Sequence, residues 1–458
     1  MKKHTALSAY NRIHFIGIGG VSMSGLAETL ARDGFIISGS DRDASAATRR
    51  LEAAGITINI GTVAENITPD MDLVVYNAAI KPDNPERMAA VTMGIPTIVR
   101  GELLRLILQA YKYPVCVAGS HGKTSTTALI TAIALHAGLD PTVNVGGYIG
   151  GTNYFVGDSP YFILEACEYT NSFHHWHPHI GVILNIDADH MDFYGSMDAI
   201  IDAFAKFARN IRPGGTLVIQ DGVPGFDRII EGLTCKIVTF GADENASGYW
   251  AKPLLSESSK PNTQSFEVMH GSESLATVNL PLPGKYNMYN AVAAFAMARE
   301  LYLEPDIIAA GLSGSQGVKR RYEHKGQFND AIIIDDYAHH PTEIKACLAA
   351  ARVAYPTRRI ICLFQPHTYT RTRDLFDDFT QAFGQADINM FVPIFAAREP
   401  HDPTISSKML SDAVKNAVNC NSLEEAEEVL RGKLMPNDLL ITMGAGDVYL
   451  VGDRILSS

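Results

Sequence analysis

The sequence predicts an α/β protein of three domains. At 458 residues the chain is too long for one ordinary hydrophobic core and matches about three domains of roughly 150 residues each. Three times the sequence also passes from an apolar, β-branched run through a turn with Gly or His into a helix-like segment, which is typical of parallel sheets covered by helices. We expect domains at residues 1–112, 113–312 and 313–458.

The composition narrows the possible functions. Hydrophobic residues make up 46% and charged residues 19% of the chain, which suits a folded globular protein. A formal net charge of -12 opposes binding to nucleic acid or to an anionic membrane, although small anionic ligands stay possible. The six cysteines contain no CxxC pair, and no apolar stretch is long enough for a signal peptide or a membrane span. We therefore expect a cytoplasmic protein with reduced cysteines.

Each block has its own pattern of strands. The first opens with RIHFIGIGG and continues into a helix, which predicts a Rossmann-like domain. The second opens with YPVCVAGS, predicts a parallel sheet like that of phosphate-loop ATPases, and adds the hairpin-like SFEVMHGSESLATVNL as a small antiparallel part. The third holds AIIIDDYAHH, RRIICLFQPH and DLLITMGAGD with helices between them, which predicts a second Rossmann-like domain.

The most specific local motif is VAGSHGKTS at residues 117–125, where a buried strand ends and a helix begins. Small residues allow backbone amides to face a nucleotide phosphate, Lys123 can reach the terminal phosphates, and Thr124 can offer a hydroxyl to Mg²⁺. The spacing departs from G-x-x-x-x-G-K-[ST], which requires Gly where Val117 stands. The alternative is a glycine-containing turn with a solvated lysine.

Two further predicted strands end in groups that bind metals. YFILEACE ends in Glu165 and Glu168, and VILNIDADH ends in Asn185, Asp187, Asp189 and His190. Because the carboxyl ends of parallel strands meet beside the phosphate loop, hard oxygen ligands there suit Mg²⁺. Glu165 and His190 are the metal candidates, and helix capping or a solvated loop is the alternative.

The first glycine loop has two possible ligands. GIGGVS resembles the dinucleotide pattern G-x-G-x-x-G, but Ser22 replaces the third glycine, and Asp41 occupies the usual ribose position. The loop predicts either NAD or the diphosphate of a UDP-sugar. The candidate residues for this ligand are Gly17, Gly19, Gly20, Ser22, Ser24 and Asp41.

These motifs together resemble the Mur ligase family over nearly the full chain. EACEYTNSF and LNIDADHMD follow the phosphate loop, and PGKYNMYNA, GVKRRYE, DDYAHHPTEI, QPHTYTRT and MGAGD follow in the family's order. Each motif alone is weak, whereas the ordered set is specific. GIGGVSMSGLAE and DYAHHPTE are most similar to the family member that adds L-alanine.

The resemblance implies an ATP-dependent, Mg²⁺-requiring ligase of peptidoglycan precursor synthesis. The first domain would bind UDP-N-acetylmuramate, and ATP would bind between the second and third domains. An acyl phosphate on the lactoyl carboxylate would react with L-alanine and give ADP and phosphate. We expect a monomer or a homodimer, and selectivity among alanine, glycine and serine rests on the resemblance alone.

The resemblance also assigns roles to residues of this chain. The triphosphate would lie on Gly119, Ser120, His121, Gly122, Lys123, Thr124 and Ser125, and magnesium on Thr124, Glu165 and His190. Adenine would contact Asn287 and Asn290, and the phosphate and ribose side would contact Arg320 and Asp336. The muramoyl carboxylate and the amino acid would lie near Tyr337, His339, His367 and Arg371. The expected catalytic residues are Lys123, His190, His339 and Arg371.

Two positions depart from the family pattern. Thr368 stands where Arg is common, so one substrate-side cation is expected from elsewhere, with Arg373 as the candidate. Phe204 stands where several members carry a carbamoylated lysine, so no such group is expected. His339 is predicted either to receive or position the amine proton or to be a structural histidine.

Three other functions stay open. They are a recycling ligase that adds a peptide to the same acceptor, an NAD-dependent oxidoreductase, and a non-catalytic nucleotide-binding regulator.

Overall fold

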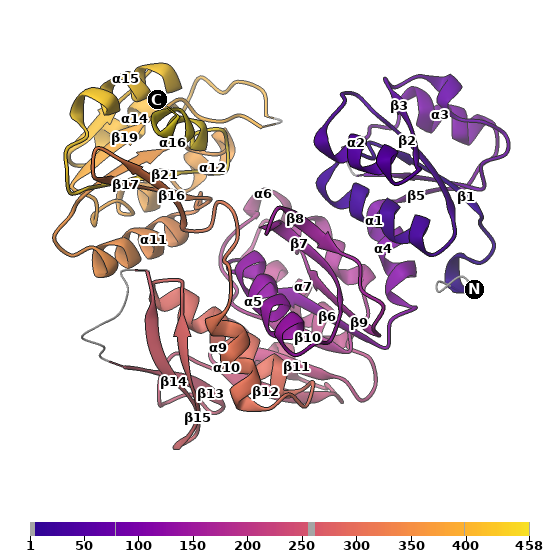
Figure 1. Cartoon of the computed structure of the whole chain (residues 1–458), viewed down its shortest axis with the longest axis horizontal. Coiled ribbons are helices and arrows are strands. Elements are labelled where there is room, and N and C mark those ends of the chain that lie inside the picture. The colour runs from indigo at the N-terminus through magenta and orange to yellow at the C-terminus, as the bar shows by residue number, and fades with distance from the viewer. Residues whose placement is uncertain (1–4, 78, 255–261, 398, 458) are drawn as a thin grey trace. The chain divides into compact units, whose positions relative to one another are not determined.

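The computed structural model describes most of the chain, namely residues 5–77, 79–254, 262–397 and 399–457. Parallel strands alternate with helices along the chain (Figure 1), so the α/β class predicted from the sequence is confirmed. The chain divides into two compact units. The first unit contains Met1–Phe240 and Ala296–Leu303, and the second contains Gly241–Phe295 and Glu304–Ser458.

The first unit begins with a five-stranded parallel sheet in the order β3-β2-β1-β4-β5. Its strands are β1 (Arg12–Ile16), β2 (Ile36–Asp41), β3 (Thr57–Ile60), β4 (Leu73–Tyr76) and β5 (Thr97–Val99). Its helices are η1 (Thr5–Leu7), α1 (Val21–Arg32), α2 (Ala46–Ala53), η2 (Ala64–Asn66), α3 (Pro85–Thr92) and α4 (Arg100–Leu108). Alternation along β1 buries Ile13 and Phe15 in one apolar cluster and Ile16 in another, so both faces of the sheet are covered.

The same unit continues with a second sheet, whose strands in this unit run in the order β12-β11-β10-β6-β9-β7-β8. All neighbours are parallel except the β7–β8 pair. The strands are β6 (Tyr113–Ala118), β7 (Thr142–Ile149), β8 (Thr152–Phe155), β9 (Tyr161–Glu165), β10 (Ile180–Ile183), β11 (Thr216–Gln220) and β12 (Lys236–Phe240). The helices are α5 (Lys123–His136), η3 (Tyr169–His175), α6 (Met191–Tyr194), α7 (Met197–Arg209) and α8 (Phe226–Ile230).

One continuous apolar cluster joins these two sheets. It includes Phe15 of β1 and Leu104 of α4, and it extends to Phe162 of β9 and Phe207 of α7. Burial of a large apolar side chain contributes about 1.5–3 kcal/mol, so the shared cluster holds the first 240 residues together as one unit.

The second unit contains the small antiparallel part that the sequence predicts. Strands β13 (Tyr249–Pro253), β14 (Gln264–His270) and β15 (Glu273–Leu280) pair in sequence order. Helix α10 (Pro305–Ser313) packs against β15. Helix α9 (Lys285–Arg299) begins in this unit and ends in the first one.

The last sheet of the second unit runs in the order β16-β17-β21-β18-β19-β20, and only the β16–β17 pair is antiparallel. Its strands are β16 (Glu323–Phe328), β17 (Ala331–Asp336), β18 (Arg359–Phe364), β19 (Ile388–Phe391), β20 (Ala417–Asn419) and β21 (Asp438–Met443). Its helices are α11 (Pro341–Ala354), α12 (Tyr369–Asp374), α13 (Phe376–Thr380), α14 (Ser407–Ala413), α15 (Leu423–Lys433) and α16 (Tyr449–Leu456).

Burial on alternate sides of β17 explains the layers around this sheet. Ile332 and Ile334 lie in a cluster with residues of α11, whereas Ile333 lies in a second cluster with residues of α15 and α16. A strand with apolar residues on both faces needs helices on both sides. Among the described residues, no helix is both long and apolar enough to span a bilayer.

Candidate active site

The phosphate loop connects the end of β6 to the start of α5. Gly119 and Gly122 have φ angles of +146° and +83°, a region that residues with a side chain rarely adopt. A Cβ atom on Gly119 would also lie 2.9 Å from the Cβ of Leu184. The two glycines therefore let the loop turn tightly against β10 and direct it into the first turn of α5, where Thr124 and Ser125 lie.

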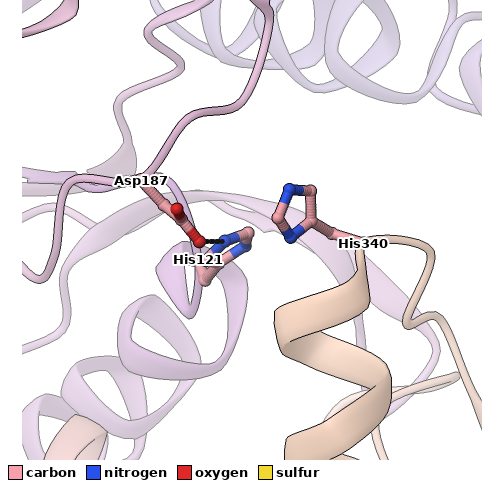
Figure 2. Close-up of side chains that lie close together, drawn as sticks. All are labelled: His121, Asp187 and His340. Atoms are coloured by element: carbon pink, nitrogen blue, oxygen red, sulfur yellow. Dashed lines mark hydrogen bonds and ion pairs between the residues drawn. The ribbon is translucent and has the colours of Figure 1, made fainter. Parts of the chain in front are cut away.

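The segment after β10 holds this loop in place. The amide of His121 donates to Oδ1 of Asn185 (2.8 Å), and Nδ2 of Asn185 donates to the carbonyl of His121 (3.0 Å). The amide of Asp187 donates to Oγ of Ser120 (2.8 Å). Figure 2 shows the His121 ring against the Asp187 carboxylate, with Nε2 3.0 Å from Oδ2. These contacts position the loop before any ligand binds.

Lys123 forms a buried ion pair at the centre of the loop. Its Nζ donates to the carbonyl of Ser120 (3.0 Å) and lies 2.8 Å from Oε2 of Glu168, whose side chain is only 3% exposed. Burial disfavours the charge on Lys123, but the carboxylates of Glu168 and Glu165 outweigh this effect and raise its pKa. Burial likewise opposes ionisation of Glu168, and the Lys123 charge and the hydrogen bond with His190 still hold its pKa below the usual value. Both groups are charged at neutral pH.

A carboxylate and imidazole cluster lies beside this ion pair. Glu168, Asp189 and His190 offer ligand atoms that all lie within 4.8 Å of one another. Nε2 of His190 lies 3.5 Å from Oε1 of Glu168 and 3.7 Å from Oδ2 of Asp189. Mg²⁺ prefers such hard oxygen ligands, so the donor set fits a magnesium ion.

Two of the three predicted metal residues contact each other, and the third contacts a carboxylate that was not predicted as a ligand. Oγ1 of Thr124 donates to Oε2 of Glu165 (2.8 Å), and the same oxygen accepts from the amide of Gly146 (2.8 Å). The structure thus brings Thr124 to Glu165 and brings His190 to Glu168. Glu168 and Asp189 belong to the motifs of the sequence analysis, but sequence reasoning did not choose them as ligands because strand-end position alone cannot separate neighbouring carboxylates.

The amides of the N-terminal glycine loop donate to residues of β2. The amides of Gly17 and Ile18 donate to the carbonyl of Ser40, and the amide of Gly19 donates to Oδ2 of Asp41 (2.8 Å). Gly20 precedes α1 directly, and Ser24 is buried within that helix. Asp41 therefore contacts the N-terminal glycine loop, and the two were predicted to bind the same ligand.

Sequence reasoning missed a cation beside this loop. Nη1 of Arg100 donates to Oγ of Ser22 (3.0 Å), and Nδ2 of Asn144 donates to the same hydroxyl (3.0 Å). In the described part of the chain, Ser22 is the only hydrogen-bond partner of the Arg100 guanidinium, and burial lowers the pKa of this group. Arg100 and Ser22 are 78 positions apart, so no local motif contains both.

In the second unit, the end of β17 carries several predicted residues. Asp336 is buried, and its carboxylate accepts the amides of Tyr322 (2.7 Å) and Ala338 (2.8 Å). Burial outweighs these bonds and raises the pKa of Asp336 to about 6. Nε of Arg320 lies 3.1 Å from the carboxylate of Asp335, and its guanidinium stacks over the Tyr337 ring at 4.9 Å.

Two histidines and an arginine lie close together just after the ends of β17 and β18. The rings of His339 and His367 lie 5.7 Å apart, edge to face, and Nη1 of Arg371 donates to the carbonyl of His367 (3.1 Å). Burial and the nearby Arg371 lower the pKa of His367. Nδ1 of His339 lies 2.9 Å from the carbonyl oxygen of Tyr337. The structure thus brings four predicted substrate-side residues together.

Thr368 and Arg373 have partners that the sequence did not reveal. The hydroxyls of Thr368 and Thr370 donate to the carboxylate of Glu399, which also accepts the amide of Thr370 (3.0 Å). Nη1 of Arg373 lies 2.7 Å from Asp402, and its Nε lies 3.1 Å from Asp374. Because two carboxylates neutralise Arg373, it is a poor replacement for the cation missing at position 368.

The two remaining predicted residues lie on α9. Asn287 and Asn290 are 3% and 6% exposed. Nδ2 of Asn287 donates to the carbonyl of Pro283 (2.8 Å), which fixes the start of the helix. Phe204, where no carbamoylated lysine is expected, is buried on α7 against Phe173.

A lysine-bearing loop between a strand and a helix, with acidic groups at neighbouring strand ends, defines a class of α/β enzymes that bind nucleotide phosphates. Three family models match successive parts of the chain: the Mur ligase family, catalytic domain (residues 12–112), the Mur ligase middle domain (117–298) and the Mur ligase, glutamate ligase domain (320–446). The chain belongs to the Mur ligase family and is a ligase of three domains. None of these models describes an oxidoreductase.

Individual relatives are similar over the whole length. A protein of Clostridium novyi named UDP-N-acetylmuramate--L-alanine ligase is 45% identical, with 98% of this chain and 97% of the relative covered. A relative of the same name from Lachnospira eligens is 44% identical, with 97% of each chain covered. The solved UDP-N-acetylmuramate-alanine ligase of Thermotoga maritima has a TM-score of 0.80 at 28% identity and covers 97% of this chain and 98% of its own.

Proposed function

We propose that this protein uses ATP to join L-alanine to the lactoyl carboxylate of UDP-N-acetylmuramate in peptidoglycan precursor synthesis. The observation that carries this proposal is the buried pair of Lys123 and Glu168 beside the phosphate loop. The lysine of this pair places a fixed positive charge at the start of α5, next to acidic groups that suit magnesium. The names of the full-length relatives support the acceptor and the amino acid.

The first chemical step transfers the γ-phosphoryl group of ATP to a carboxylate oxygen of the acceptor. The bond between the γ-phosphorus and the oxygen that bridges the β- and γ-phosphates breaks. ADP leaves, and an acyl phosphate forms. Lys123 offsets the negative charge of the transferring group, because its ammonium is buried and held by carbonyls of its own loop. The amides at the start of α5 receive the phosphates.

Magnesium would be held by the residues at the strand ends. The fitting groups are the hydroxyl of Thr124, the carboxylates of Glu165, Glu168 and Asp189, and the imidazole of His190. When bound, the ion supplies positive charge to the phosphate oxygens.

The second step forms the amide bond. The neutral amine of L-alanine attacks the acyl carbon, and the bond between this carbon and the phosphate oxygen breaks. Phosphate leaves with the electron pair of that bond, and the amine loses a proton. His339 is our candidate for the group that receives or orients this proton, and Arg371 for the cation that binds the amino-acid carboxylate. Tyr337 and His367 lie with them and complete the substrate side.

The nucleotide and acceptor contacts follow from the family resemblance. We assign adenine to Asn287 and Asn290, the ribose and phosphate side to Arg320 and Asp336, and the triphosphate to the loop from Gly119 to Ser125. The UDP part of the acceptor is assigned to the N-terminal loop, with the residues Gly17, Gly19, Gly20, Ser22, Ser24 and Asp41. A cytoplasmic monomer or homodimer is the expected form.

A substrate panel tests the proposal. Phosphate release is measured with ATP, Mg²⁺, UDP-N-acetylmuramate and one amine donor at a time: L-alanine, glycine, L-serine or an alanine-initiated tripeptide. We expect release to require both the acceptor and an amino acid, with the highest kcat/KM for L-alanine. A higher kcat/KM for the tripeptide would identify a recycling ligase, and release that ignores the acceptor would remove the ligase function.

A further inference from the structure

Two aromatic rings beside the metal-binding cluster are exposed. Tyr169, the first residue of η3, is 41% exposed, and Phe193 on α6 is 43% exposed. Phe193 is the only phenylalanine with a largely exposed side chain among those that the structure describes. Leaving such a side chain in water forgoes about 1.5–3 kcal/mol of burial, so the two rings offer a ligand an apolar surface to bury.

Their neighbours hold both rings in fixed orientations. The Tyr169 and His190 rings lie 4.7 Å apart with planes inclined by 37°, and the Tyr169 and Phe193 rings lie 5.9 Å apart, edge to face. Phe193 also packs edge to face on Tyr194 at 4.9 Å. Oη of Tyr194 donates to the carbonyl of Glu168 (2.6 Å), so the aromatic group is tied to the backbone of the metal-binding cluster.

The place of these rings in the first unit indicates the part of a ligand that they contact. On one side, Tyr169 packs on His190, which contacts Glu168, the partner of Lys123. On the other side, η3 packs against α4, and Arg100 at the start of α4 contacts Ser22 beside the glycine loop. A chain of contacts therefore runs from the glycine loop through η3 to the lysine.

The acceptor of the proposed reaction has its parts in the same order. UDP-N-acetylmuramate carries a diphosphate on one side of its pyranose ring and the reacting lactoyl carboxylate on another. If the diphosphate lies at the glycine loop and the carboxylate near Lys123, the pyranose ring falls beside Tyr169. The C–H face of a pyranose is apolar and slightly positive, and it packs well on the negative face of an aromatic ring.

We propose that Tyr169 and Phe193 form an aromatic platform that binds the pyranose ring of the acceptor. This inference rests on the proposed function and deepens it, because it names the part of the chain that selects a sugar. The rings contribute packing and orientation, and the nearby Glu168 carboxylate and His190 imidazole keep their own roles.

Direct binding separates the platform from the diphosphate site. The affinities of UDP-N-acetylmuramate and of UDP, which lacks the sugar, are measured by calorimetry for the full-length protein and for Tyr169→Ala, Phe193→Ala and the double variant. We expect each single variant to weaken UDP-N-acetylmuramate about tenfold and to leave UDP within about twofold. Equal weakening of both ligands, or unchanged affinity for both, would overturn the platform.

Kinetics supplies the second readout and the controls. The KM for UDP-N-acetylmuramate should rise, whereas the KM values for ATP and L-alanine stay constant. Tyr169→Phe keeps the ring and should restore the acceptor affinity that Tyr169→Ala loses, and Tyr302→Ala, which removes a 91% exposed aromatic ring that follows α9, should have no effect. A selective rise in the KM for ATP would assign the rings to adenine and overturn the inference.

The failure of the platform and the failure of the proposed function give different results. If the unchanged protein releases phosphate with UDP-N-acetylmuramate and L-alanine, but the double variant binds the acceptor normally, only the platform is wrong. If the unchanged protein binds the acceptor but releases no phosphate with any amino acid, the proposed function is wrong, and loss of acceptor binding in the double variant still supports the platform.

Discussion

The two glycine loops of the first unit share one architecture but obtain their charge differently. Each follows a parallel strand and precedes a helix: the N-terminal loop joins β1 to α1, and the phosphate loop joins β6 to α5. The phosphate loop contains its own cation, Lys123, which is paired with Glu168. The N-terminal loop contains no cation, and the positive group beside it, Arg100, comes from a helix far along the chain.

This difference explains what each loop can do. In the proposed reaction, a lysine within the loop would contact the phosphate that moves, so its charge would act in the transition state. A guanidinium that reaches the loop from another helix, and that shares Ser22 with Asn144, suits the binding of a group that stays in place. We therefore expect changes at the phosphate loop to alter turnover and changes at the N-terminal loop to alter binding.

The largest expected effect is that of Lys123→Ala. Loss of the ammonium removes charge stabilisation in phosphoryl transfer, so kcat should fall roughly 10³-fold. Phosphate release with ATP, UDP-N-acetylmuramate and L-alanine measures it. Lys236→Ala is the matched control, because this lysine is 63% exposed and pairs with Glu300 at the surface.

Stability must be separated from catalysis in this variant. Lys123→Ala leaves the buried carboxylate of Glu168 without its partner, which lowers stability. The double variant Lys123→Ala/Glu168→Gln removes that charge, so its thermal midpoint should recover while turnover stays lost. Normal turnover in either variant would contradict the phosphate assignment.

The sequence predicted the strand, loop and helix pattern well, because period and glycine placement are local signals. It also predicted that the loop with Lys123 lies beside acidic residues of neighbouring strand ends, since parallel strand ends converge. It missed Arg100 and Glu399, because their partners Ser22 and Thr368 lie 78 and 31 positions away. It named Glu165 and His190 as metal candidates, and the structure places the Glu168 carboxylate at His190, because side-chain direction beyond the strand end is not a local sequence signal.

The strands that lead into the two loops also differ, which gives a pH prediction. β1 carries His14, fully buried, whose pKa burial lowers to about 4. At the centre of β6 the titratable group is Cys116, whose pKa burial raises. Between pH 6.5 and 4 the unfolded chain binds a proton at His14 and the folded chain does not. Stability around β1 should therefore fall by about 3 kcal/mol as the pH drops through this window.

Amide exchange, corrected for its intrinsic pH dependence, measures this loss separately for β1 and β6. His14→Gln removes the titrating group and should flatten the dependence at β1. Ser38 lies 2.9 Å from the His14 ring, so a small loss of stability at all pH values accompanies the change. An unaltered slope in the variant would assign the acid sensitivity to other groups.

Alanine at matched glycines tests how tightly each loop is built. In Gly119→Ala, the new Cβ is strained by the φ of +146° and lies too close to the side chain of Leu184, so we expect about 3 kcal/mol of destabilisation. In Gly19→Ala, the new Cβ lies close to the side-chain ends of Asp41 and Thr48, which can move, so we expect about 1 kcal/mol of destabilisation. Urea unfolding of both variants measures the difference. Equal losses would show that the two loops are equally constrained.

The smallest expected effect on the enzyme kinetics is the one that tests the distant cation. Arg100→Gln keeps a donor for Ser22 but removes the charge, so the KM for UDP-N-acetylmuramate should rise about tenfold, or about 1.4 kcal/mol, with kcat nearly unchanged. Arg105→Gln on the same helix is the control, because Arg105 pairs with Glu102 instead. If the KM for ATP rose and the KM for the acceptor did not, Arg100 would serve the nucleotide, and the division of labour between the two loops would be wrong.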